Sequence, residues 1–422
     1  MSARLTVVGL GKLGLPLAGF YAMRGATVRG VDRDHRRVRA IAERTTIDLE
    51  KEQGLRVALD ALAPDQFTVT TDTAAAVAGS DHVIVVVPVI ARAHNSVDLG
   101  AMEAACDAIA AGLRPGTTVI IETTLPLGTT RERLLPRLAR SGLEVGRELF
   151  VAFSPERVFV GRIFEDLGKY PKIVGGVDDA SGRRAAAFYE AHLSAPVWQL
   201  KNAEAAEFVK LAETCYRTTS IALANELAMV ADAKGIDVFE VIRGANSQPY
   251  SNILEPGIGV GGHCLPVYPF LLEESGVDVP LIERGRAINA SMGEYGVTRL
   301  EAALGSLAGT HVLIMGVAFR PGVQETAFSP AFDVRDALTK RGARVSAVDP
   351  LYSDDELTAL GFVPGRIPAP DVDAVVLQTA HQEFASFDVR AFPRCRVVLD
   401  GRNLLDRTVV EAAGIQFVGI GR

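Results

Sequence analysis

The chain has 422 residues, more than one hydrophobic core usually supports, so at least two domains are expected. Its formal net charge of −7 includes no basic stripe, which argues against nucleic acid as the main partner. No apolar run reaches the roughly 20 residues that span a bilayer, and the first residues run straight into a strand without a secretory leader, so a cytoplasmic protein away from membranes is expected. The four cysteines show neither zinc-site spacing nor a disulfide framework, and no metal site is expected.

Short β-branched runs alternate with helical stretches, which indicates βαβ units and mostly parallel sheets. A first region, ending near Val197, has five candidate strands: LTVVGL at 5–10, TVRGVD at 27–32, HVIVVVP at 82–88, TVIIET at 118–123 and LFVAFSP at 149–155. Residues 202–234 contain neither Gly nor Pro and repeat apolar residues at helical spacing, which predicts one long connector helix. A later region adds four candidate strands: THVLIMGVAF at 310–319, ARVSAVDP at 343–350, DAVVLQTA at 373–380 and CRVVLDGRN at 395–403.

A glycine-rich turn follows the first candidate strand and opens a helical stretch, which is the context of a dinucleotide-binding loop. Gly9 permits the tight turn, Gly11 lets the backbone approach a pyrophosphate, and Gly14 allows close helix packing. Asp32, at the end of the next strand, can accept hydrogen bonds from an adenosine ribose and repel a 2′-phosphate, so NAD is predicted over NADP. The neighbouring Arg33 is expected over the adenine or in solvent.

Four further motifs occur in order along the chain: ETTLPLGTT at 122–130, SPERVFVG at 154–161, AEFVKLAET at 206–214 and PGIGVGGHCLPVYP at 256–269. Together with GVAFRPGVQET at 316–326 and VVLDGRN at 397–403, they resemble the UDP-glucose/GDP-mannose dehydrogenase family across nearly the whole chain. SPERV followed by Gly161, and GVGGHC followed by PVYP, are most similar to the branch that acts on N-acetylhexosamines.

The resemblance implies an α/β fold with two Rossmann-like doubly wound domains, joined by a long central helix and a helical middle domain. The expected boundaries are 1–197 for an NAD-binding domain, 198–305 for a central dimerisation domain with the cysteine loop, and 306–422 for a UDP-sugar-binding domain. It also implies NAD as cofactor, a UDP-sugar as substrate and a homodimer formed through the connector helix.

The same resemblance assigns catalytic roles. Cys264 matches the family nucleophile, whose thiolate captures an aldehyde that then loses a second hydride. Lys210 matches the catalytic lysine, Glu156 the glutamate that assists thioester hydrolysis, and Thr124 a threonine that positions water, with Thr214 beside them. Without the family context, Cys264 would be read as a small buried hydrophobe, and Glu156 as a charge at a helix start.

Binding residues follow from the same comparison. Those expected at the cofactor are Gly9, Gly11, Leu13, Gly14, Asp32, Arg33, Pro88 and Thr124. Those expected at the substrate are Glu156, Arg157, Val158, Lys210, Tyr250, Ser251, Asn252, Gly257, Gly261, Tyr268, Arg286, Phe319 and Arg320. The segment with Arg286 and Asn289 either approaches the substrate phosphate or forms a solvated helix face.

Three positions depart from the family pattern. Thr214 replaces a usual Asn, Tyr268 replaces an Asp that orients the catalytic groups, and Ala327 replaces a frequent Arg. The predicted reaction is the four-electron oxidation of a UDP-N-acetylhexosamine to a uronic acid, with UDP-glucose as the second substrate considered. The chain could also be an enzyme limited to one oxidation, or a non-catalytic nucleotide-sugar sensor. Retention of the four matched catalytic residues counts against the sensor.

Overall fold

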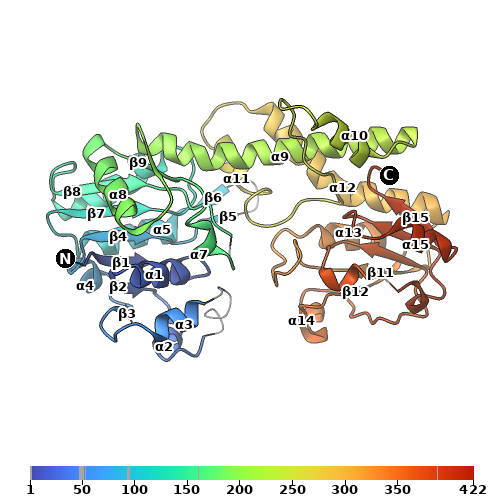
Figure 1. The fold of residues 1–422 in the computed structure, drawn as a ribbon, viewed down its shortest axis with the longest axis horizontal. Helices are drawn as coiled ribbons and strands as arrows, with labels where there is room; N and C mark the ends of the chain where they lie inside the picture. The colour runs from blue at the N-terminus through green and yellow to red at the C-terminus, as the bar shows by residue number, and fades with distance from the viewer. Residues whose placement is uncertain (1, 47–51, 53, 93–95, 160, 387) are drawn as a thin grey trace. The chain divides into compact units, whose positions relative to one another are not determined.

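The computed structural model describes residues 2–46, 52, 54–92, 96–159, 161–386 and 388–422. The chain forms two compact units. Unit 1 comprises Met1–Glu213 and Phe270–Val277, and unit 2 comprises Thr214–Pro269 and Asp278–Arg422. Each unit contains one large, mostly parallel sheet, so the predicted α/β class with two doubly wound halves is confirmed (Figure 1).

Unit 1 is built on an eight-stranded sheet in the order β10-β9-β8-β7-β4-β1-β2-β3. Neighbouring strands are parallel except β8 and β9, which run antiparallel, so β9 begins at the edge where β7 and β8 end. A separate hairpin pairs β5 (Ile90–Arg92) with β6 (Ser96–Asp98). The strands of the large sheet are β1 (Arg4–Val8), β2 (Thr27–Val31), β3 (Phe67–Thr70), β4 (His82–Val85), β7 (Thr117–Ile121), β8 (Leu149–Phe153), β9 (Lys172–Gly176) and β10 (Val197–Leu200).

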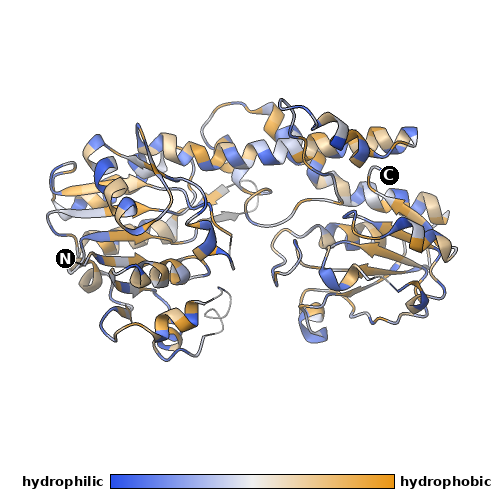
Figure 2. Ribbon diagram, in the orientation of Figure 1, coloured by the Kyte–Doolittle hydropathy of each residue, from blue (hydrophilic) through white to orange (hydrophobic). Residues whose placement is uncertain are grey.

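Helices cover both faces of this sheet, as the apolar character of its central strands requires (Figure 2). One face packs against α1 and α8, and the other against α4, α5 and the first turn of α9. The helical segments of unit 1 are α1 (Gly14–Met23), α2 (His35–Ala42), α3 (Leu55–Asp60), α4 (Thr73–Ala78), α5 (Gly100–Ala110), a π-helical turn (Thr130–Leu134), α6 (Leu135–Leu138), a 3₁₀ turn (Ala139–Ser141), α7 (Ile163–Asp166) and α8 (Asp179–His192).

The predicted connector helix is confirmed as α9, which spans Ala203–Lys234 without interruption. Its residues up to Glu213 belong to unit 1, and those from Thr214 belong to unit 2. The boundary expected at residue 197 falls on the first residue of β10, so the sheet continues to Leu200. The domain boundaries expected after residues 197 and 305 both stay a prediction.

Unit 2 contains a parallel five-stranded sheet in the order β12-β11-β13-β14-β15. Its strands are β11 (His311–Met315), β12 (Arg344–Val348), β13 (Ala374–Leu377), β14 (Val397–Asp400) and β15 (Gln416–Gly419). The remaining helical segments are α10 (Val238–Ala245), α11 (Tyr268–Glu273), α12 (Pro280–Leu304), α13 (Pro330–Lys340), α14 (Asp354–Ala359), two 3₁₀ turns (Gln382–Phe384 and Val389–Ala391) and α15 (Arg407–Ala412). Helix α11 begins in unit 2 and ends in unit 1.

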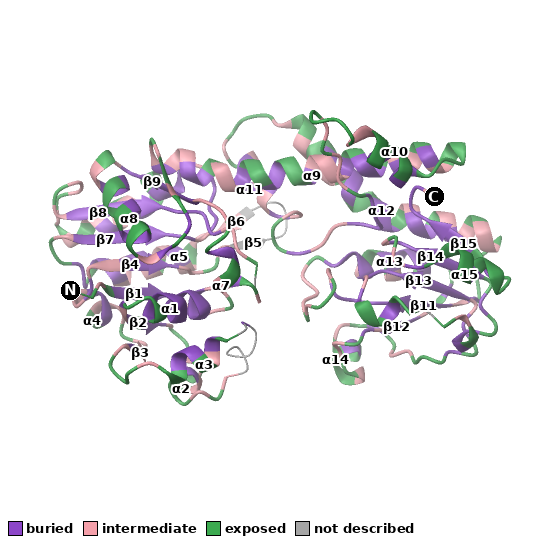
Figure 3. Cartoon of the chain, in the orientation of Figure 1, coloured by how far each residue is buried: buried purple, intermediate pink, exposed green. Residues whose placement is uncertain are grey.

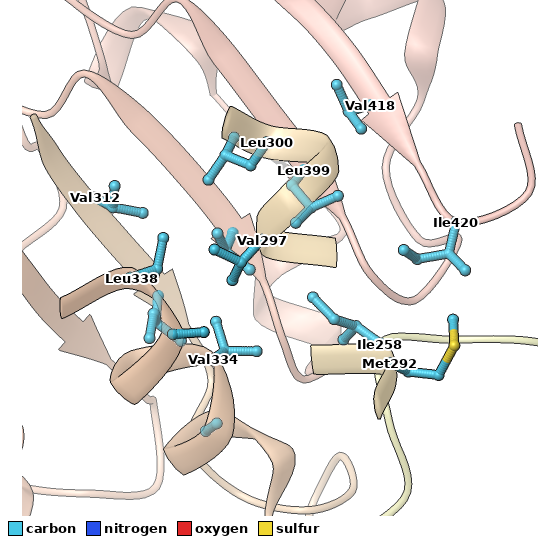
Figure 4. Packing of buried hydrophobic residues seen from close by; sticks show 14 of the residues in the cluster. Ile258, Met292, Val297, Leu300, Val312, Val334, Leu338, Leu399, Val418 and Ile420 are labelled. Atoms are coloured by element: carbon cyan, nitrogen blue, oxygen red, sulfur yellow. The ribbon is translucent and has the colours of Figure 1, made fainter. Parts of the chain in front are cut away.

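The main core of unit 2 lies between this sheet and the helices α12 and α13 (Figure 4). Met292, Val297 and Leu300 of α12 are buried there with Leu399 of β14. Ile258, which belongs to the predicted cysteine loop, is fully buried in the same cluster. The loop is therefore anchored in a hydrophobic core on one side of the predicted nucleophile. Figure 3 shows the central strands of each sheet as buried.

All nine predicted strands are present, with ends displaced by one to several residues. Strands β3, β9, β10 and β15 and the short β5 and β6 were not predicted from the sequence. Among the described residues, no helix combines the length and apolar composition needed to cross a bilayer.

Candidate active site

The glycine-rich turn lies between β1 and α1, and two of its glycines are required by backbone packing. Gly9 has φ 96°, and a Cβ there would lie 2.6 Å from the Val86 carbonyl oxygen. A Cβ on Gly14 would lie 1.8 Å from the Gly9 carbonyl oxygen, whereas one on Gly11 would meet no atom within 4 Å. The turn is thus closely packed at both ends and open at Gly11, as approach by a pyrophosphate requires.

The start of α1 and the end of β2 complete this arrangement. Helix α1 has Leu13 at its N-cap, with no capping side chain and no acidic residue in the first turn, so its N-terminal NH groups suit a phosphate. The Asp32 carboxylate accepts from the Leu10 and Asp34 NH groups, each at 3.0 Å, and is partly exposed. Arg33 is exposed, as expected for a residue over the adenine or in solvent. These residues fit an NAD, which would supply the hydride acceptor.

The other predicted cofactor residues lie on loops at the same edge of the sheet. Pro88 follows β4 and is exposed, and Thr124 follows β7 and is buried. The Thr123 hydroxyl donates to the Val87 carbonyl at 2.7 Å, which ties these two loops together. Chain topology therefore places Pro88 and Thr124 beside the glycine-rich turn, at the edge where doubly wound sheets bind ligands.

Glu156 lies on the loop after β8, not at a helix start, and its carboxylate is buried. The Lys172 ammonium, on the first residue of β9, contacts the Glu156 carboxylate at 2.8 Å and the Glu122 carboxylate at 3.2 Å. Arg157 NH donates to Glu156 Oε1 at 2.8 Å. Residue 160 of the same motif lies outside the described residues.

The two buried carboxylates differ in their proton affinity. Burial raises the pKa of Glu122 to about 7, against the opposing charge of Lys172. Burial acts in the same direction on Glu156, but the charge and hydrogen bond of Lys172, the Arg157 NH and the charge of Lys210 together outweigh it. The pKa of Glu156 therefore lies below its ordinary value. Near neutral pH, Glu156 is therefore ionised, as a base that activates water must be.

Lys210 of α9 and the two residues that follow Glu156 make contacts within unit 1. Lys210 Nζ donates to the Glu156 carbonyl at 2.8 Å, so the connector helix holds this loop through its lysine. The Arg157 guanidinium pairs with Glu213 at 3.0 Å, donates to the Pro171 carbonyl and lies 5.4 Å from the centre of the Tyr170 ring. Val158 is partly buried and packs against the core beneath α1.

In unit 2, the cysteine loop (residues 256–264) is held on both sides by α9. The Asn225 side chain accepts from Gly257 NH at 3.0 Å, and the Thr218 hydroxyl donates to the Leu265 carbonyl at 3.2 Å. Asn289 of α12 joins the two supports, because its amide accepts from Asn225 and donates to the Thr218 carbonyl, each at 2.9 Å. Asn289 is therefore a buried cross-link and not part of a solvated face.

Cys264 itself is exposed, whereas Cys106, Cys215 and Cys395 are buried. Burial raises the pKa of Cys106 to about 12 and that of Cys395 to about 11, which keeps both thiols protonated and unreactive at neutral pH. The interpretation of Cys264 as a buried small hydrophobe is wrong, because its loop leaves the thiol in contact with solvent.

The glycines of this loop serve packing within unit 2. A Cβ on Gly261 would lie 2.7 Å from Phe319 Cβ, and one on Gly262 would lie 2.8 Å from the Phe319 ring. Gly259, at φ 117°, is similarly confined by Pro330. Phe319 therefore occupies the space beside Gly261 and Gly262.

The remaining predicted substrate residues are dispersed in unit 2. Tyr250 is 94% exposed. Ser251 accepts a hydrogen bond from the Gln248 side chain of the same loop, and the Asn252 side chain donates to the Tyr216 hydroxyl of α9 at 3.2 Å. The predicted substrate residues of unit 2 that are at least partly buried are Ser251, Gly257, Gly261, Tyr268, Arg286, Phe319 and Arg320, and the predicted catalytic Thr214 is also buried. Tyr268 starts α11 and donates its NH to the Cys264 carbonyl at 2.9 Å, so its backbone fixes the segment that follows the thiol.

Three family models cover this chain in the order of its domains. The NAD binding domain of the UDP-glucose/GDP-mannose dehydrogenase family matches residues 3–193, the central domain residues 204–291, and the UDP binding domain residues 313–407. The chain belongs to the UDP-glucose/GDP-mannose dehydrogenase family. It is an NAD-dependent nucleotide-sugar dehydrogenase of this family, and the predicted family, cofactor and enzyme class are confirmed.

Individual relatives match over almost the full length. The UDP-N-acetyl-D-mannosamine dehydrogenase of Methanocaldococcus jannaschii is 33% identical, over 99% of this chain and 96% of that protein. The structure of UDP-D-ManNAc dehydrogenase from Pyrococcus horikoshii is 32% identical with a TM-score of 0.87, covering 99% of both chains. A UDP-glucose dehydrogenase from Pyrobaculum islandicum is 27% identical with a TM-score of 0.88, covering 100% of this chain and 98% of that one.

Sequence reasoning missed Glu122, Lys172 and Asn225. Two signals were present: Glu122 interrupts an otherwise apolar strand end two residues before Thr124, and Lys172 opens the apolar run KIVGG. A charge at the end of a buried strand needs a partner, so these two residues could have been paired with Glu156. The support from Asn225 depends on contacts between distant segments, and no local pattern indicates it.

Proposed function

We propose that this protein oxidises the C6 alcohol of a UDP-N-acetylhexosamine of the mannosamine type to the carboxylate, using two NAD per turnover. The observation that carries the proposal is Cys264, an exposed thiol on a loop that is fixed by hydrogen bonds on both sides. The acetylated substrate is favoured by the relatives named UDP-N-acetyl-D-mannosamine dehydrogenase, at about 30% identity over the full length.

The chemistry divides into two oxidations. When bound, NAD accepts the hydride from C6 in each of them. The first oxidation gives an aldehyde, to which the Cys264 sulfur adds to form a thiohemiacetal; the second oxidation converts this adduct to a thioester. Water then attacks the thioester, the carbon–sulfur bond breaks and the thiol is regenerated. The overall reaction consumes the alcohol, one water and two NAD⁺, and yields the carboxylate, two NADH and three protons.

The roles of the unit 1 residues follow from their chemistry. Glu156 is an ionised carboxylate and takes a proton from the attacking water. Lys210 has an ammonium group that balances negative charge on a reacting oxygen, and its contact with the Glu156 carbonyl holds the loop of that base. Thr124 places a hydroxyl at the edge of the sheet, where it can orient water.

UDP-glucose remains the second candidate substrate. The UDP-glucose dehydrogenase of P. islandicum has the same TM-score, within 0.01, as the P. horikoshii enzyme. The fold therefore does not separate the two substrates, and the choice of the acetylated sugar rests on sequence identity.

A single oxidation is the second candidate reaction, and Tyr268 is the residue that favours it. A phenol cannot replace the charge of the carboxylate that the family usually has at this position. Such an enzyme would release the aldehyde after one hydride transfer.

One assay separates these candidates. The protein is incubated with NAD and each of UDP-N-acetylmannosamine, UDP-N-acetylglucosamine and UDP-glucose, and both NADH and product mass are recorded. We expect the highest kcat/KM with UDP-N-acetylmannosamine and two NADH per carboxylate. One NADH with an aldehyde product would contradict the four-electron reaction, and preference for UDP-glucose would contradict the assigned substrate.

We also propose a cytoplasmic homodimer that uses the exposed side of α9. Tyr216, Leu223 and Val230 are large, exposed and spaced by seven residues, so they lie along one stripe of the helix. Leu223→Glu should convert a dimer to a monomer in light scattering, with Glu226→Gln as the control on the same helix. A monomeric wild-type protein would contradict the proposal.

A further inference from the structure

A group of buried charges lies at one edge of the unit 1 sheet. Glu122 follows β7, Glu156 follows β8, and Lys172 opens the antiparallel β9. The β8–β9 register pairs Phe153 with Gly175, and continuing it beyond β8 brings position 156 opposite position 172. The fold therefore brings one ammonium group to two carboxylates that precede it in the chain.

These charges are fully enclosed. The side chains of Lys172 and Glu156 are each 6% exposed and that of Glu122 is 0% exposed. Tyr189 of α8 donates its hydroxyl to Glu122 Oε1, and its ring lies 4.9 Å from the Lys172 nitrogen. Charges buried to this extent persist only when they are paired, so Lys172 is the cation on which both carboxylates depend.

Other ionisable groups also face this cluster. Tyr21 of α1 has a buried hydroxyl, and burial, together with its proximity to both carboxylates, raises its pKa well above the ordinary value. Tyr170 senses the charge of Glu156, and burial raises its pKa to about 12, so both phenols stay neutral. Lys210 approaches Glu156 from α9 and adds a second positive charge. The group of this cluster that titrates near neutral pH is therefore Glu122, whose pKa burial raises to about 7.

We propose that Lys172 and Glu122 are positioning residues for the base Glu156, with Lys172 keeping its carboxylate ionised and oriented and Glu122 competing for the same cation. The inference rests on the proposed role of Glu156 in thioester hydrolysis. It assigns functions to two residues that have no direct contact with substrate in the proposed mechanism.

The two residues act on Glu156 in opposite directions. Removing Lys172 leaves two buried carboxylates without their common cation, so the pKa of Glu156 rises and the base is ionised only at higher pH. Removing the charge of Glu122 leaves Lys172 to Glu156 alone, so the pKa of Glu156 falls further. If the ion pair only stabilised the fold, the pH dependence of thioester hydrolysis would not follow these shifts in the pKa of Glu156.

The test follows the pH profile of acyl-enzyme hydrolysis in Lys172→Met, Glu122→Gln and the double variant. Intact-protein mass spectrometry after rapid quenching measures the loss of the acyl adduct. In Lys172→Met we expect the rate at neutral pH to fall about 100-fold, the scale of general-base catalysis, and to recover at high pH. The acid limb is the part of the pH profile in which the hydrolysis rate falls as the pH is lowered. In Glu122→Gln we expect this limb to move to lower pH. In the double variant we expect it to return from its position in Lys172→Met toward that of the wild type.

Two controls address folding. Lys169→Met removes an exposed lysine from the same segment and should leave the profile unchanged. Lys172→Arg keeps the cation and should restore most of the rate. Equal, pH-independent losses in Lys172→Met and the double variant would overturn the proposal, and so would a Lys172→Met profile with an unmoved acid limb in folded protein.

A measurement without substrate separates this inference from the proposed function. Infrared difference spectra of the unliganded protein across neutral pH should show one buried carboxyl group titrating, because burial raises the pKa of Glu122 to about 7. The signal should be absent in Glu122→Gln. If the wild type forms no carboxylate from any UDP-sugar, the proposed function fails while this titration persists; if the titration is absent from an active enzyme, the positioning inference fails alone.

Discussion

The two units differ in the hydrogen bonds of an aspartate at the edge of the sheet where the parallel strands end. In each unit an aspartate follows the second strand and accepts a backbone NH from the loop after the first strand: Asp32 from Leu10 at 3.0 Å, and Asp349 from Val317 at 2.7 Å. Asp32 is partly exposed and keeps capacity to accept hydrogen bonds from a ribose. Asp349 is 3% exposed and also binds Ala318 NH, Leu351 NH and the His381 ring.

The loops at these two edges also differ, because one leaves open space and the other is hydrogen-bonded to neighbouring segments. In unit 1, Gly11 leaves open space beside the glycine-rich turn. In unit 2, the cysteine loop is bonded to the segments that follow β14 and β11, through Ile258 NH to the Gly401 carbonyl and Gly262 NH to the Ala327 carbonyl. The same architecture therefore carries the predicted cofactor site where the aspartate is partly exposed, and the loop of the predicted nucleophile where the aspartate is buried.

The largest expected effect is that of removing the Cys264 thiol from the cysteine loop. Cys264→Ala should reduce carboxylate formation by at least about 10³-fold, because the second oxidation requires the covalent adduct, while slow exchange between alcohol and aldehyde can persist. Product mass and isotope exchange measure the two activities. Cys395→Ala, a buried thiol in the same unit, is the control and should keep activity. Near wild-type carboxylate production by Cys264→Ala would exclude a covalent role for this cysteine.

The next largest expected effect is on stability and comes from replacing the buried aspartate of unit 2, Asp349. Asp349→Ala leaves buried NH groups without acceptors and should lower the free energy of unfolding by about 3 kcal/mol. Hydrogen bonds hold the pKa of Asp349 below its ordinary value despite burial. Its stabilisation is thus complete above about pH 4 and is lost as pH falls through the lower folded pKa. Urea titrations at neutral and acid pH should show the gap between wild type and variant narrowing in acid; a constant gap would contradict the role of the charge.

The partly exposed aspartate of unit 1, Asp32, should behave differently. Asp32→Ala is expected to raise KM for NAD about tenfold and to reduce the preference over NADP, with little loss of stability, because Asp32 is partly exposed. Steady-state kinetics with both cofactors and a thermal melt measure the two effects. A wild-type preference for NADP, or a variant as unstable as Asp349→Ala, would remove the distinction between the two positions.

The smallest effect concerns the predicted phosphate contact in unit 2. Arg286→Ala should raise KM for the UDP-sugar about fivefold and leave kcat unchanged, since a partly exposed diphosphate contact acts equally on the ground state and the transition state. Arg284→Ala, on an exposed position of the same helix, serves as control. An unchanged KM for every active UDP-sugar would exclude Arg286 from the site.

The sequence predicted those elements whose formation depends on residues that are close together in the chain. The glycine-rich turn, the nine strand candidates and the uninterrupted α9 follow from glycine spacing, β-branched runs and helical periodicity, and all are confirmed. Strand β3 (FTVT) was missed because half of its residues are polar threonines, and β9 (KIVGG) because two of its five residues are glycines. The charged group around Lys172 could not be predicted as a unit, because its members come together only through the antiparallel pairing of β9.

The glycines of the cysteine loop show a different limit. Phe319 packs against Gly261 and Gly262, and nothing in the sequence of the loop indicates which distant residue would do so. The catalytic roles of Thr124, Glu156, Lys210 and Cys264 came from resemblance to the family and stay predictions until the variants are measured.

Because Cys264 is exposed and the other three cysteines are buried, a thiol reagent should modify the folded protein at a single site. A maleimide dye should label the folded wild type at Cys264 alone, since the other thiols are shielded from the reagent. Labelling would then report on occupancy of the loop: a bound UDP-sugar should slow the reaction, and a dye attached there should respond to ligands without any turnover. Candidate nucleotide sugars could be ranked this way in the absence of cofactor.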